Sequence, residues 1–542
     1  VTVAAPLRKV LVKQPELPFP EGKAIAEVLK ASSNNGSVKE LLIGGGLGAI
    51  LEFMQVGLKV IANNYQVWFT VKRTIWGFGV GFSATLIGAG YLIGFELCLS
   101  IFLGAVVGWL CAVPIFSELY PNYHLHYLPV EAVHHLWNAK IRYLGIGAML
   151  FSGLWAFLKM LGPLCRSIYS TSSSVLSPTN RIGLPRTEKD IPFVHLMLMA
   201  SILSAVMFIF FQAEFPIANL GFNYNLSPTI IFLFVIYVFV IGFLFAVITA
   251  FFSGLVGVTA SPGSSIIIAG MLLLGWLLSS AMTYVTQQAL TLHQIQAAEA
   301  VTIIIGSVVT GIAAISNDNM QDLKVGYILG ATPWKQQIML LLGVFVAALV
   351  IPPIMQLLYN VYGIAGIVPR PHMDPALSLP APPAALMAAI TQAVFNFGLP
   401  WKLLCIGAML AIGFLLVQWL VAKKTKTKLS VLGFAIGIYL PMTSTIPLFI
   451  GGCLSLIIHK KLKNNARAKQ ISGSHKGMLL ACGLVAGAAL MDVLLAIPFS
   501  LSHSASVLQL DVLIWDGSAL GFGILSTLLL CWYFIKTVCQ AK

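Results

Sequence analysis

Long apolar runs are the feature that most constrains the fold of this chain. Runs such as Ile230–Phe252, Gly477–Ile497 and Ser518–Ile535 approach the roughly 20 apolar residues that a helix needs to cross a bilayer. Of the 542 residues, 58% are hydrophobic and 9% are charged, whereas about 25% are charged in soluble domains. We therefore predict an all-α polytopic membrane protein with about 13–15 transmembrane or re-entrant helices, some broken near the midplane.

Basic residues in the loops predict the topology. Cytoplasmic loops are enriched in Lys and Arg, so the basic stretches Lys159–Lys189, Lys423–Lys428 and Lys460–Lys476 are expected inside. Three loops without Lys or Arg are expected outside: 213–228, 286–298 and 499–514. The net charge of +14 then indicates contact with anionic lipid headgroups, and no nucleic-acid partner is expected.

This topology divides the chain into four parts. A cytoplasmic N-terminal segment (1–40) precedes a first transmembrane half (41–316), a cytoplasmic polar loop (317–336) and a second transmembrane half (337–542). One segment fits poorly: residues 62–77 carry Lys72 and Arg73 but fall outside.

A broken hairpin is predicted at 430–458. The basic stretches on both sides are expected inside, so about 30 residues must enter the membrane and return, fewer than two full spans need. Prolines at the centre disfavour continuous helix. Unwound backbone at this depth is typical of transporter substrate sites, although a Pro-kinked structural hairpin would show the same pattern. The candidate substrate-binding residues are Tyr439, Pro441, Thr443, Ser444 and Thr445.

Two further breaks lie in the first half. Ser253–Ser265 is rich in Gly and Ser and adds Thr259, Ser261 and Pro262 to the candidate substrate site. Gly77–Pro114 is interrupted at Gly88–Gly94, with Glu96 just beyond. Paired interruptions point to a transporter site, whereas close packing by small residues is the structural alternative.

The polar run Asn317–Gln337 is unusual in so apolar a chain. On a helix, Asp318 and Asp322 are four residues apart and share a face, which suits a group that loads and unloads a proton. Lys324 would not face Asp322 and could meet a substrate carboxylate. A solvated loop with helix caps is the alternative. The candidate coupling or gating residues are Glu96, Asp318, Gln321, Asp322, Lys324 and Tyr327.

Other ionisable residues are candidates for proton coupling and for metal binding. Glu52, Glu96 and Asp492 lie deepest in the predicted spans, and Glu96 is the first choice for proton coupling because it follows the glycine-rich break. Four histidines between His124 and His135 lack a helical i,i+4 pair, so we expect no metal site. The eight cysteines form no CxxC pair, and no cofactor is expected.

Several segments resemble the oligopeptide transporter (OPT) superfamily, which includes the yellow-stripe-like carriers. Gln321–Pro333, followed by Gln336 and Gln337, is similar to the family's QDxKxGYxxGAxP…QQ signature. Pro18–Ala31 is similar to its FPxGxAxAEVLKA segment, and Leu379–Pro382 and Ile438–Pro441 match further blocks.

The chain departs from the family pattern in two places. In the family several spans usually precede the FPxGxAxAEVLKA segment, so we expect a bacterial member that is N-terminally truncated. In Gly483–Leu490 the family commonly has Glu after the second glycine, where this chain has Ala488. An acid that could have bound a proton or cation is absent there.

The resemblance implies a secondary active transporter of small peptides or metal–chelate complexes, with proton symport and alternating access, in a bacterial inner membrane. Oligomeric state stays open. The chain lacks GxxxxGK[ST] and GxSxG, so neither ATP-driven transport within this chain nor serine catalysis is expected, and we do not predict an enzyme. The alternatives are a membrane-embedded enzyme or lipid-handling protein, and a non-transporting partner subunit.

Overall fold

The structure is a computed structural model of the chain. It describes residues 38–121, 128–152, 185–256 except 216 and 223, 263–371 except 288–289 and 365, and 378–539 except 380, 396–399, 425–428, 464–466, 503–506 and 511–515. Scattered positions between 8 and 29, together with 155, 258 and 373, are also described.

Helices dominate the described residues, which confirms the prediction of an all-α polytopic membrane protein. Ten of these helices are long and apolar enough to cross a membrane, and two shorter apolar helices accompany them. The spans are Lys39–Gly57, Phe95–Leu119, Val194–Glu214, Ser227–Phe251, Leu292–Leu329, Pro333–Tyr362, Trp401–Lys424, Met442–Leu462, Lys476–Phe499 and Ser518–Cys539.

The chain forms two compact units that alternate along the sequence. Unit 1 comprises Val1–Ser33, Gly153–Val350 and Pro383–Leu399, and unit 2 comprises Asn34–Ser152, Ile351–Pro382 and Pro400–Lys542. The prediction divided the chain into two consecutive transmembrane halves, which differs from these units. Hydropathy and loop charge do not indicate which distant helices pack together.

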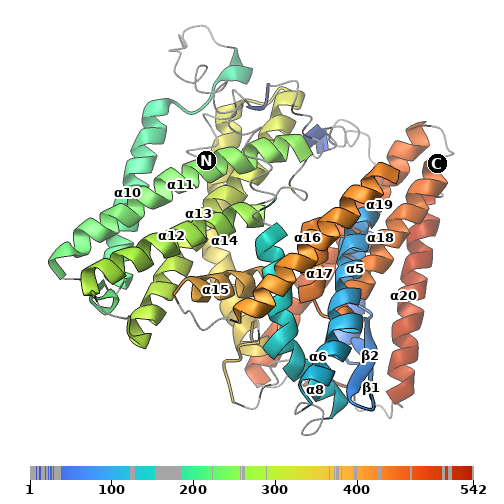
Figure 1. Ribbon diagram of the computed structural model, residues 1–542. Coiled ribbons are helices and arrows are strands. Elements are labelled where there is room, and N and C mark those ends of the chain that lie inside the picture. The colour runs from blue at the N-terminus through green and yellow to red at the C-terminus, as the bar shows by residue number, and fades with distance from the viewer. Residues whose placement is uncertain are drawn as a thin grey trace. The chain divides into compact units, whose positions relative to one another are not determined.

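Unit 1 is built around the contact of α11 with α13. Its helices are α10 (Phe193–Glu214), α11 (Ser227–Val256), α12 (Gly263–Thr286), α13 (Leu292–Leu329), the first part of α14 (Pro333–Tyr362) and α15 (Pro382–Phe395) (Figure 1). Buried side chains such as Phe245, Val309 and Met320 form a continuous core between these helices.

Helix α13 includes most of the stretch that we predicted as a polar loop. A capping box of Thr291 and Gln294 starts this helix, and Gly330, in a left-handed conformation, ends it. Residues 317–329 are therefore helical, and only a short turn separates them from α14. Within the polar run, the buried side chains of Gln321 and Lys324 have partners within the chain, described below, whereas Oδ1 of Asn317 and Nδ2 of Asn319 are buried without one in the described structure.

Unit 2 contains α3 (Val38–Glu52) and the following π-helix Phe53–Gly57, the strands β1 (Asn64–Val71) and β2 (Thr74–Gly81), and the helices α4 (Ala84–Ile93) and α5 (Phe95–Ala105). It continues with the π-helix Val106–Ala112, α6 (Val113–Leu119), α8 (Pro129–Leu136) and the π-helix Trp137–Ile141. The later elements are the rest of α14, α16 (Trp401–Lys424), α17 (Val431–Tyr439), α18 (Met442–Lys463), α19 (Arg467–Ser502) and α20 (Asp516–Cys539).

Two broken hairpins pack against each other in unit 2. Helices α4 and α5 join at Gly94, whose φ of 89° favours glycine, and α17 and α18 join at Leu440 and Pro441. A methyl group at Gly437 would overlap the carbonyl oxygen of Ile101, and one at Gly90 would overlap that of Leu448. The glycines thus let the backbones of the two hairpins touch.

The hairpin predicted at 430–458 forms, but its two legs differ in length. Helix α17 has 9 residues and α18 has 22, or about 14 and 33 Å at 1.5 Å per residue. The prediction was two short helices that meet near the midplane, whereas α18 alone is long enough to cross. Pro447 does not interrupt α18, because its missing N–H frees only a carbonyl near the start of the helix.

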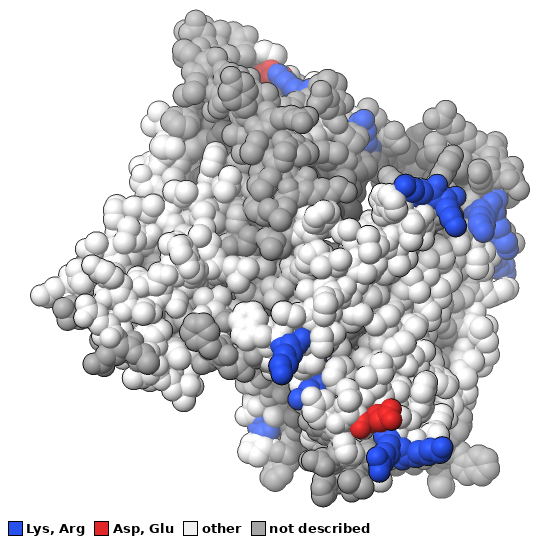
Figure 2. Space-filling view, in the orientation of Figure 1, with Lys and Arg blue, Asp and Glu red and all other residues white. Residues whose placement is uncertain are grey.

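Residues 64–81 form a β-hairpin, which the sequence analysis did not predict. The strands β1 and β2 are antiparallel, with Val71 opposite Thr74 across the turn at Lys72 and Arg73. The basic pair that fitted the predicted topology poorly is therefore the tip of a hairpin, and the start of the interrupted stretch Gly77–Pro114 is strand. Figure 2 shows the charged side chains of unit 2 near the two ends of its helices, with uncharged surface between them.

Candidate functional site

The break between α17 and α18 is held open by an indole group. Pro441 disfavours helix at the preceding residue, and Leu440 is accordingly extended, with φ −71° and ψ 145°. Its carbonyl leaves the helical ladder and accepts a hydrogen bond of 2.8 Å from the indole N–H of Trp109. The break therefore has a fixed geometry and a defined partner.

Four aromatic rings gather at this break, and we call them the aromatic cluster. The ring centroids of Trp68 and Trp109 lie 5.9 Å apart, those of Trp109 and Trp137 6.4 Å, and those of Trp137 and Tyr439 5.8 Å. Trp109 and Trp137 belong to the π-helices Val106–Ala112 and Trp137–Ile141. Single π-helical turns occur frequently at functional sites, so their presence on two sides of the break is informative.

The cluster offers two polar groups to a ligand. The indole N–H of Trp137 is buried and has no hydrogen-bond partner in the described structure, and a buried donor without a partner is costly. The guanidinium of Arg142 donates a hydrogen bond to the hydroxyl of Tyr439 and has further N–H groups. Together these donors suit a carboxylate or carbonyl group, and the rings suit the apolar parts of the same molecule.

The predicted substrate residues of the second half lie at this break in different settings. Tyr439 and Thr445 are buried, and the Thr445 hydroxyl donates to the carbonyl of Met442 at 3.1 Å. Pro441, Thr443 and Ser444 are half-buried. Gly81 of β2 is close enough to the Thr443 carbonyl that a methyl group there would overlap it.

Other predicted positions do not join the cluster. Thr259, Ser261 and Pro262 lie outside the described residues. Glu96 is in the first turn of α5 and is exposed. The roles proposed for these four residues stay predictions.

A second polar region lies in unit 1, at the end of α13. The buried amide of Gln321 accepts a hydrogen bond from the N–H of Gly22 at 2.7 Å and donates one to the carbonyl of Ser253 at 2.6 Å. The buried ammonium group of Lys324 donates to the carbonyl of Val12 at 2.6 Å. The two sequence blocks that carry the resemblance to the OPT family thus contact each other.

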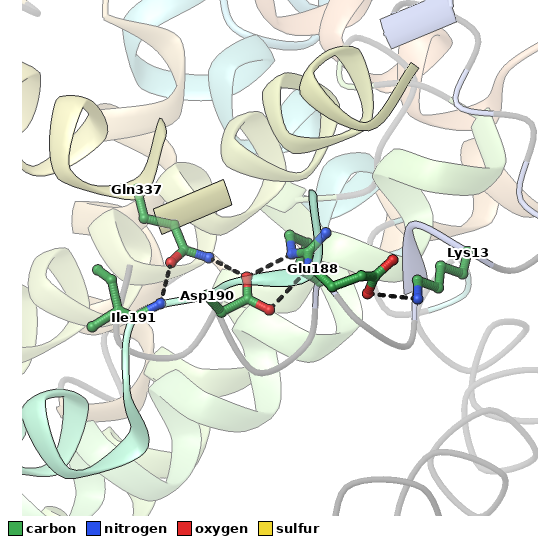
Figure 3. Close-up of polar contacts among 6 residues, drawn as sticks. Lys13, Glu188, Asp190, Ile191 and Gln337 are labelled. Atoms are coloured by element: carbon green, nitrogen blue, oxygen red, sulfur yellow. Dashed lines mark hydrogen bonds and ion pairs between the residues drawn. The ribbon is translucent and has the colours of Figure 1, made fainter. Parts of the chain in front are cut away.

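An ion pair ties the N-terminal segment to the segment before α10 (Figure 3). Arg8 is buried, and its guanidinium makes two hydrogen bonds, of 2.6 and 2.8 Å, to the carboxylate of Asp190. Gln337 donates to the same carboxylate at 2.8 Å and accepts from the N–H of Ile191 at 3.1 Å. A cavity of about 570 Å³ adjoins these residues; it is lined by Glu188, Lys189, Asp190, Ile191, Pro192, His195, Met199, Trp334, Ile338 and Leu341.

The two predicted carboxylates, Asp318 and Asp322, also lie on α13. Asp318 and Asp322 share a face, as their spacing predicted, and both are exposed, as is Tyr327. The buried polar side chains of the signature are those of Gln321, Lys324 and Gln337. The coupling or gating roles of Asp318 and Asp322 stay predictions.

Several residues that build the two regions were not predicted from the sequence. Trp109, Trp137 and Arg142 come from segments without a distinctive motif, so only the fold places them at the break. One available signal was the alternation of glycines 77, 79 and 81. Alternate residues of a strand share a face, so this pattern marks a glycine face that can approach another backbone closely.

A comparison with known proteins identifies the family. Residues 1–499 match the family model described as OPT oligopeptide transporter protein. The chain belongs to the OPT family. This confirms the resemblance carried by the Gln321–Pro333 signature, and a transporter function follows from the membership.

Curated relatives of this OPT protein come from bacteria and plants. A Haemophilus influenzae protein that carries the provisional name of oligopeptide transporter is 31% identical over 568 residues, covering 100% of this chain and 86% of that protein. The iron-phytosiderophore transporter yellow stripe 1 of Zea mays is 28% identical over 188 residues, or 33% of this chain and 27% of that protein. The metal-nicotianamine transporter YSL1 of Arabidopsis thaliana is 22% identical over 198 residues, or 35% and 29%. No solved structure matches the chain.

Proposed function

We propose that this OPT protein is a secondary active transporter that moves small peptides or metal–chelate complexes by proton symport and alternating access. The observation that carries the proposal is the aromatic cluster, in which the free indole N–H of Trp137 and the guanidinium of Arg142 lie beside the break of a hairpin. Discontinuous membrane helices with open polar groups are where transporters of several folds bind their substrates.

The chemistry of the cluster supports these substrate classes. Peptides and amino-acid-based chelators carry carboxylates and carbonyl oxygens, which accept hydrogen bonds from indole and guanidinium groups. The names of the relatives point the same way, since they refer to oligopeptides, iron-phytosiderophores and metal-nicotianamine. A bacterial inner membrane is the proposed location, and the basic loops would face the cytoplasm.

Uptake into proteoliposomes tests the proposal. The purified protein would be offered radiolabelled alanine peptides of two to six residues, or iron(II)–nicotianamine, with and without a pH gradient. We expect accumulation of at least one probe above its outside concentration only when the outside is acidic. Uptake that a collapsed gradient leaves unchanged would contradict proton symport, and the absence of binding and uptake for every probe would contradict the substrate classes.

A further inference from the structure

A seam of small residues joins α3 to α19 in unit 2. A methyl group at Gly44 or Gly48 would overlap the carbonyl oxygen of Leu480 or Leu484, and one at Gly487 would overlap that of Gly45. The two backbones are therefore in contact over about two helical turns, as in other small-residue seams of membrane helices.

The seam ends in two acids. Glu52 follows Gly48 by four residues, and Asp492 follows Ala488 by four, so both acids stay on the faces that meet. Their carboxyl groups hydrogen bond to each other, and Glu52 is only 9% exposed. Ala488, where the family commonly has Glu, is fully buried next to Gly48. This chain thus carries its acids one turn further along the seam.

The pair lies deep within the spans. The opposite end of the seam is marked by an ion pair of Lys476 and Glu40, with 3.5 Å between nitrogen and oxygen. Glu52 is twelve residues beyond Glu40, or about 18 Å along the helix, within a hydrocarbon core of about 30 Å. Both acids belong to helices long and apolar enough to cross the membrane.

A hydrogen bond between two carboxyl groups requires a proton. An ionised carboxylate only accepts hydrogen bonds, so one of the two groups must be protonated to donate. Two ionised carboxylates in direct contact would also repel each other strongly in a poorly hydrated environment. The geometry of Glu52 and Asp492 is therefore that of a pair that shares a single proton.

A third group lies against the pair. The hydroxyl oxygen of Tyr362, on α14, is buried without a hydrogen-bond partner in the described structure, and it interacts electrostatically with both acids. It could donate to whichever carboxylate loses its proton. Among the described residues, α4 packs against α3 and α19 without contributing a charged side chain, and the pair of Glu40 and Lys476 is at the far end of the seam. The π-helix Phe53–Gly57 begins directly after Glu52, and such turns often mark functional sites.

We propose that Glu52 and Asp492 form the proton-binding site of this transporter, with Tyr362 as its third polar group. In the arrangement described, the pair holds one proton between its carboxyl groups. Release of that proton to water leaves two carboxylates, one of which the Tyr362 hydroxyl can stabilise, and repulsion between them favours separation of α3 from α19. The assignment rests on the proposed symport, and it replaces Glu96, which is exposed, as the first choice for coupling.

Infrared spectroscopy of the full chain in lipid tests the site without any substrate. At neutral pH we expect a carbonyl stretching band from a protonated carboxyl group, and this band should disappear in Glu52→Gln and in Asp492→Asn. In each variant the new amide can still donate to the remaining carboxylate, which favours retention of the fold. Glu96→Gln and Glu118→Gln, which alter exposed acids of the same unit, should keep the band.

Three spectroscopic results would overturn the assignment. These are the absence of the band in the parent protein, its persistence in both Glu52→Gln and Asp492→Asn, and its appearance only after sodium is replaced by choline. The last result would show that a sodium ion, and not a proton, joins the two carboxylates.

Transport measurements separate this site from the proposed function. If both are correct, Glu52→Gln should abolish gradient-driven accumulation of the transported probe, while exchange of labelled for unlabelled probe persists at equal pH. If the parent protein neither binds nor transports any probe but its band behaves as expected, the substrate proposal fails and the proton site stands. Normal pH-driven accumulation by Glu52→Gln would refute the coupling role even if transport itself is confirmed.

Discussion

The signature in unit 1 and the break in unit 2 differ in whether their buried polar groups have hydrogen-bond partners. In unit 1, the buried polar side chains of the signature have partners: Gln321 bonds to Gly22 and Ser253, and Lys324 bonds to Val12. Just before the signature, Oδ1 of Asn317 and Nδ2 of Asn319 are buried without a partner in the described structure. At the break in unit 2, the indole N–H of Trp137 is buried without one. Satisfied groups stabilise a structure, whereas open groups are available to a ligand.

This difference separates the most recognisable sequence from the best candidate binding site. The signature is recognisable because Gln321 and Lys324 make specific contacts with the N-terminal segment, and Gln321 also with α11. We infer that the signature holds the N-terminal segment against α11 and α13 in unit 1, and that the aromatic cluster recognises the substrate. The predictions below test each side of this contrast, in order of the expected effect on stability.

The largest effect is expected from Arg8→Met, which removes one partner of a buried ion pair. Arg8 and Asp190 have side-chain exposures of 1% and 9%, and an unpaired buried charge costs about 3–5 kcal/mol. The variant should melt earlier in detergent, and proteases should cleave its N-terminal segment faster. Lys13→Met is the matched control, because the ion pair of Lys13 and Glu188 is much more exposed and should contribute less than about 1 kcal/mol. Equal losses of melting temperature in the two variants would contradict a stabilising role of the buried ion pair.

The next effect is expected from Gly487→Ala, which places a methyl group against the carbonyl oxygen of Gly45 in the seam of α3 and α19. Overpacking of this kind costs about 1–3 kcal/mol. The measurement is the thermal unfolding of the purified protein. Gly46→Ala is the control, since a methyl group there meets nothing within 4 Å, and a melting temperature equal to that of the parent is expected. A stable Gly487→Ala would show that the seam is looser than described.

Much of the fold could be predicted from the sequence, because a membrane span can be recognised from the composition of one continuous stretch of residues. Runs of apolar residues and the hairpin break at Tyr439–Pro447 depend only on neighbours in the chain, and helices appear where these predicted them. The hairpin of β1 and β2 was missed because Gly77–Gly81 reads as part of an apolar span by hydropathy. Two of its alternating glycines, Gly79 and Gly81, lie against Thr443, which is far away in the sequence.

The candidate sites were less predictable, because burial depends on tertiary contacts. Asp318 and Asp322 share a face as expected, but sequence spacing cannot say whether that face is buried, and the structure exposes it. Conversely, Glu52 and Asp492 are 440 residues apart, so nothing local indicated that their carboxyl groups meet. Trp137 had no distinguishing signal at all.

Trp109→Phe tests the structural half of the aromatic cluster. The phenyl ring keeps an aromatic contact but leaves the carbonyl of Leu440 without its donor, and an unsatisfied buried acceptor costs about 1–3 kcal/mol. We expect a lower melting temperature, measured by thermal unfolding in detergent, together with loss of uptake because the break loses its fixed geometry. A variant that is as stable as the parent would mean that water satisfies this carbonyl equally well.

Trp137→Phe should have the smallest effect on stability and still impair transport. The indole N–H of Trp137 makes no hydrogen bond in the described structure, so its loss removes no interaction and relieves the cost of a buried donor. The smaller phenyl ring keeps part of the ring contacts with Trp109 and Tyr439, so we expect a loss of about 1 kcal/mol in the free energy of unfolding. Uptake should fall about tenfold, as a lost hydrogen bond of about 1.4 kcal/mol to the substrate implies, and most of the fall should be an increase in KM.

Together with Trp109→Phe, this variant distinguishes an indole that holds the break from one that holds the ligand. If uptake by Trp137→Phe equals that of the parent, the open N–H is not part of the binding site, and the contrast between the two regions loses its functional meaning.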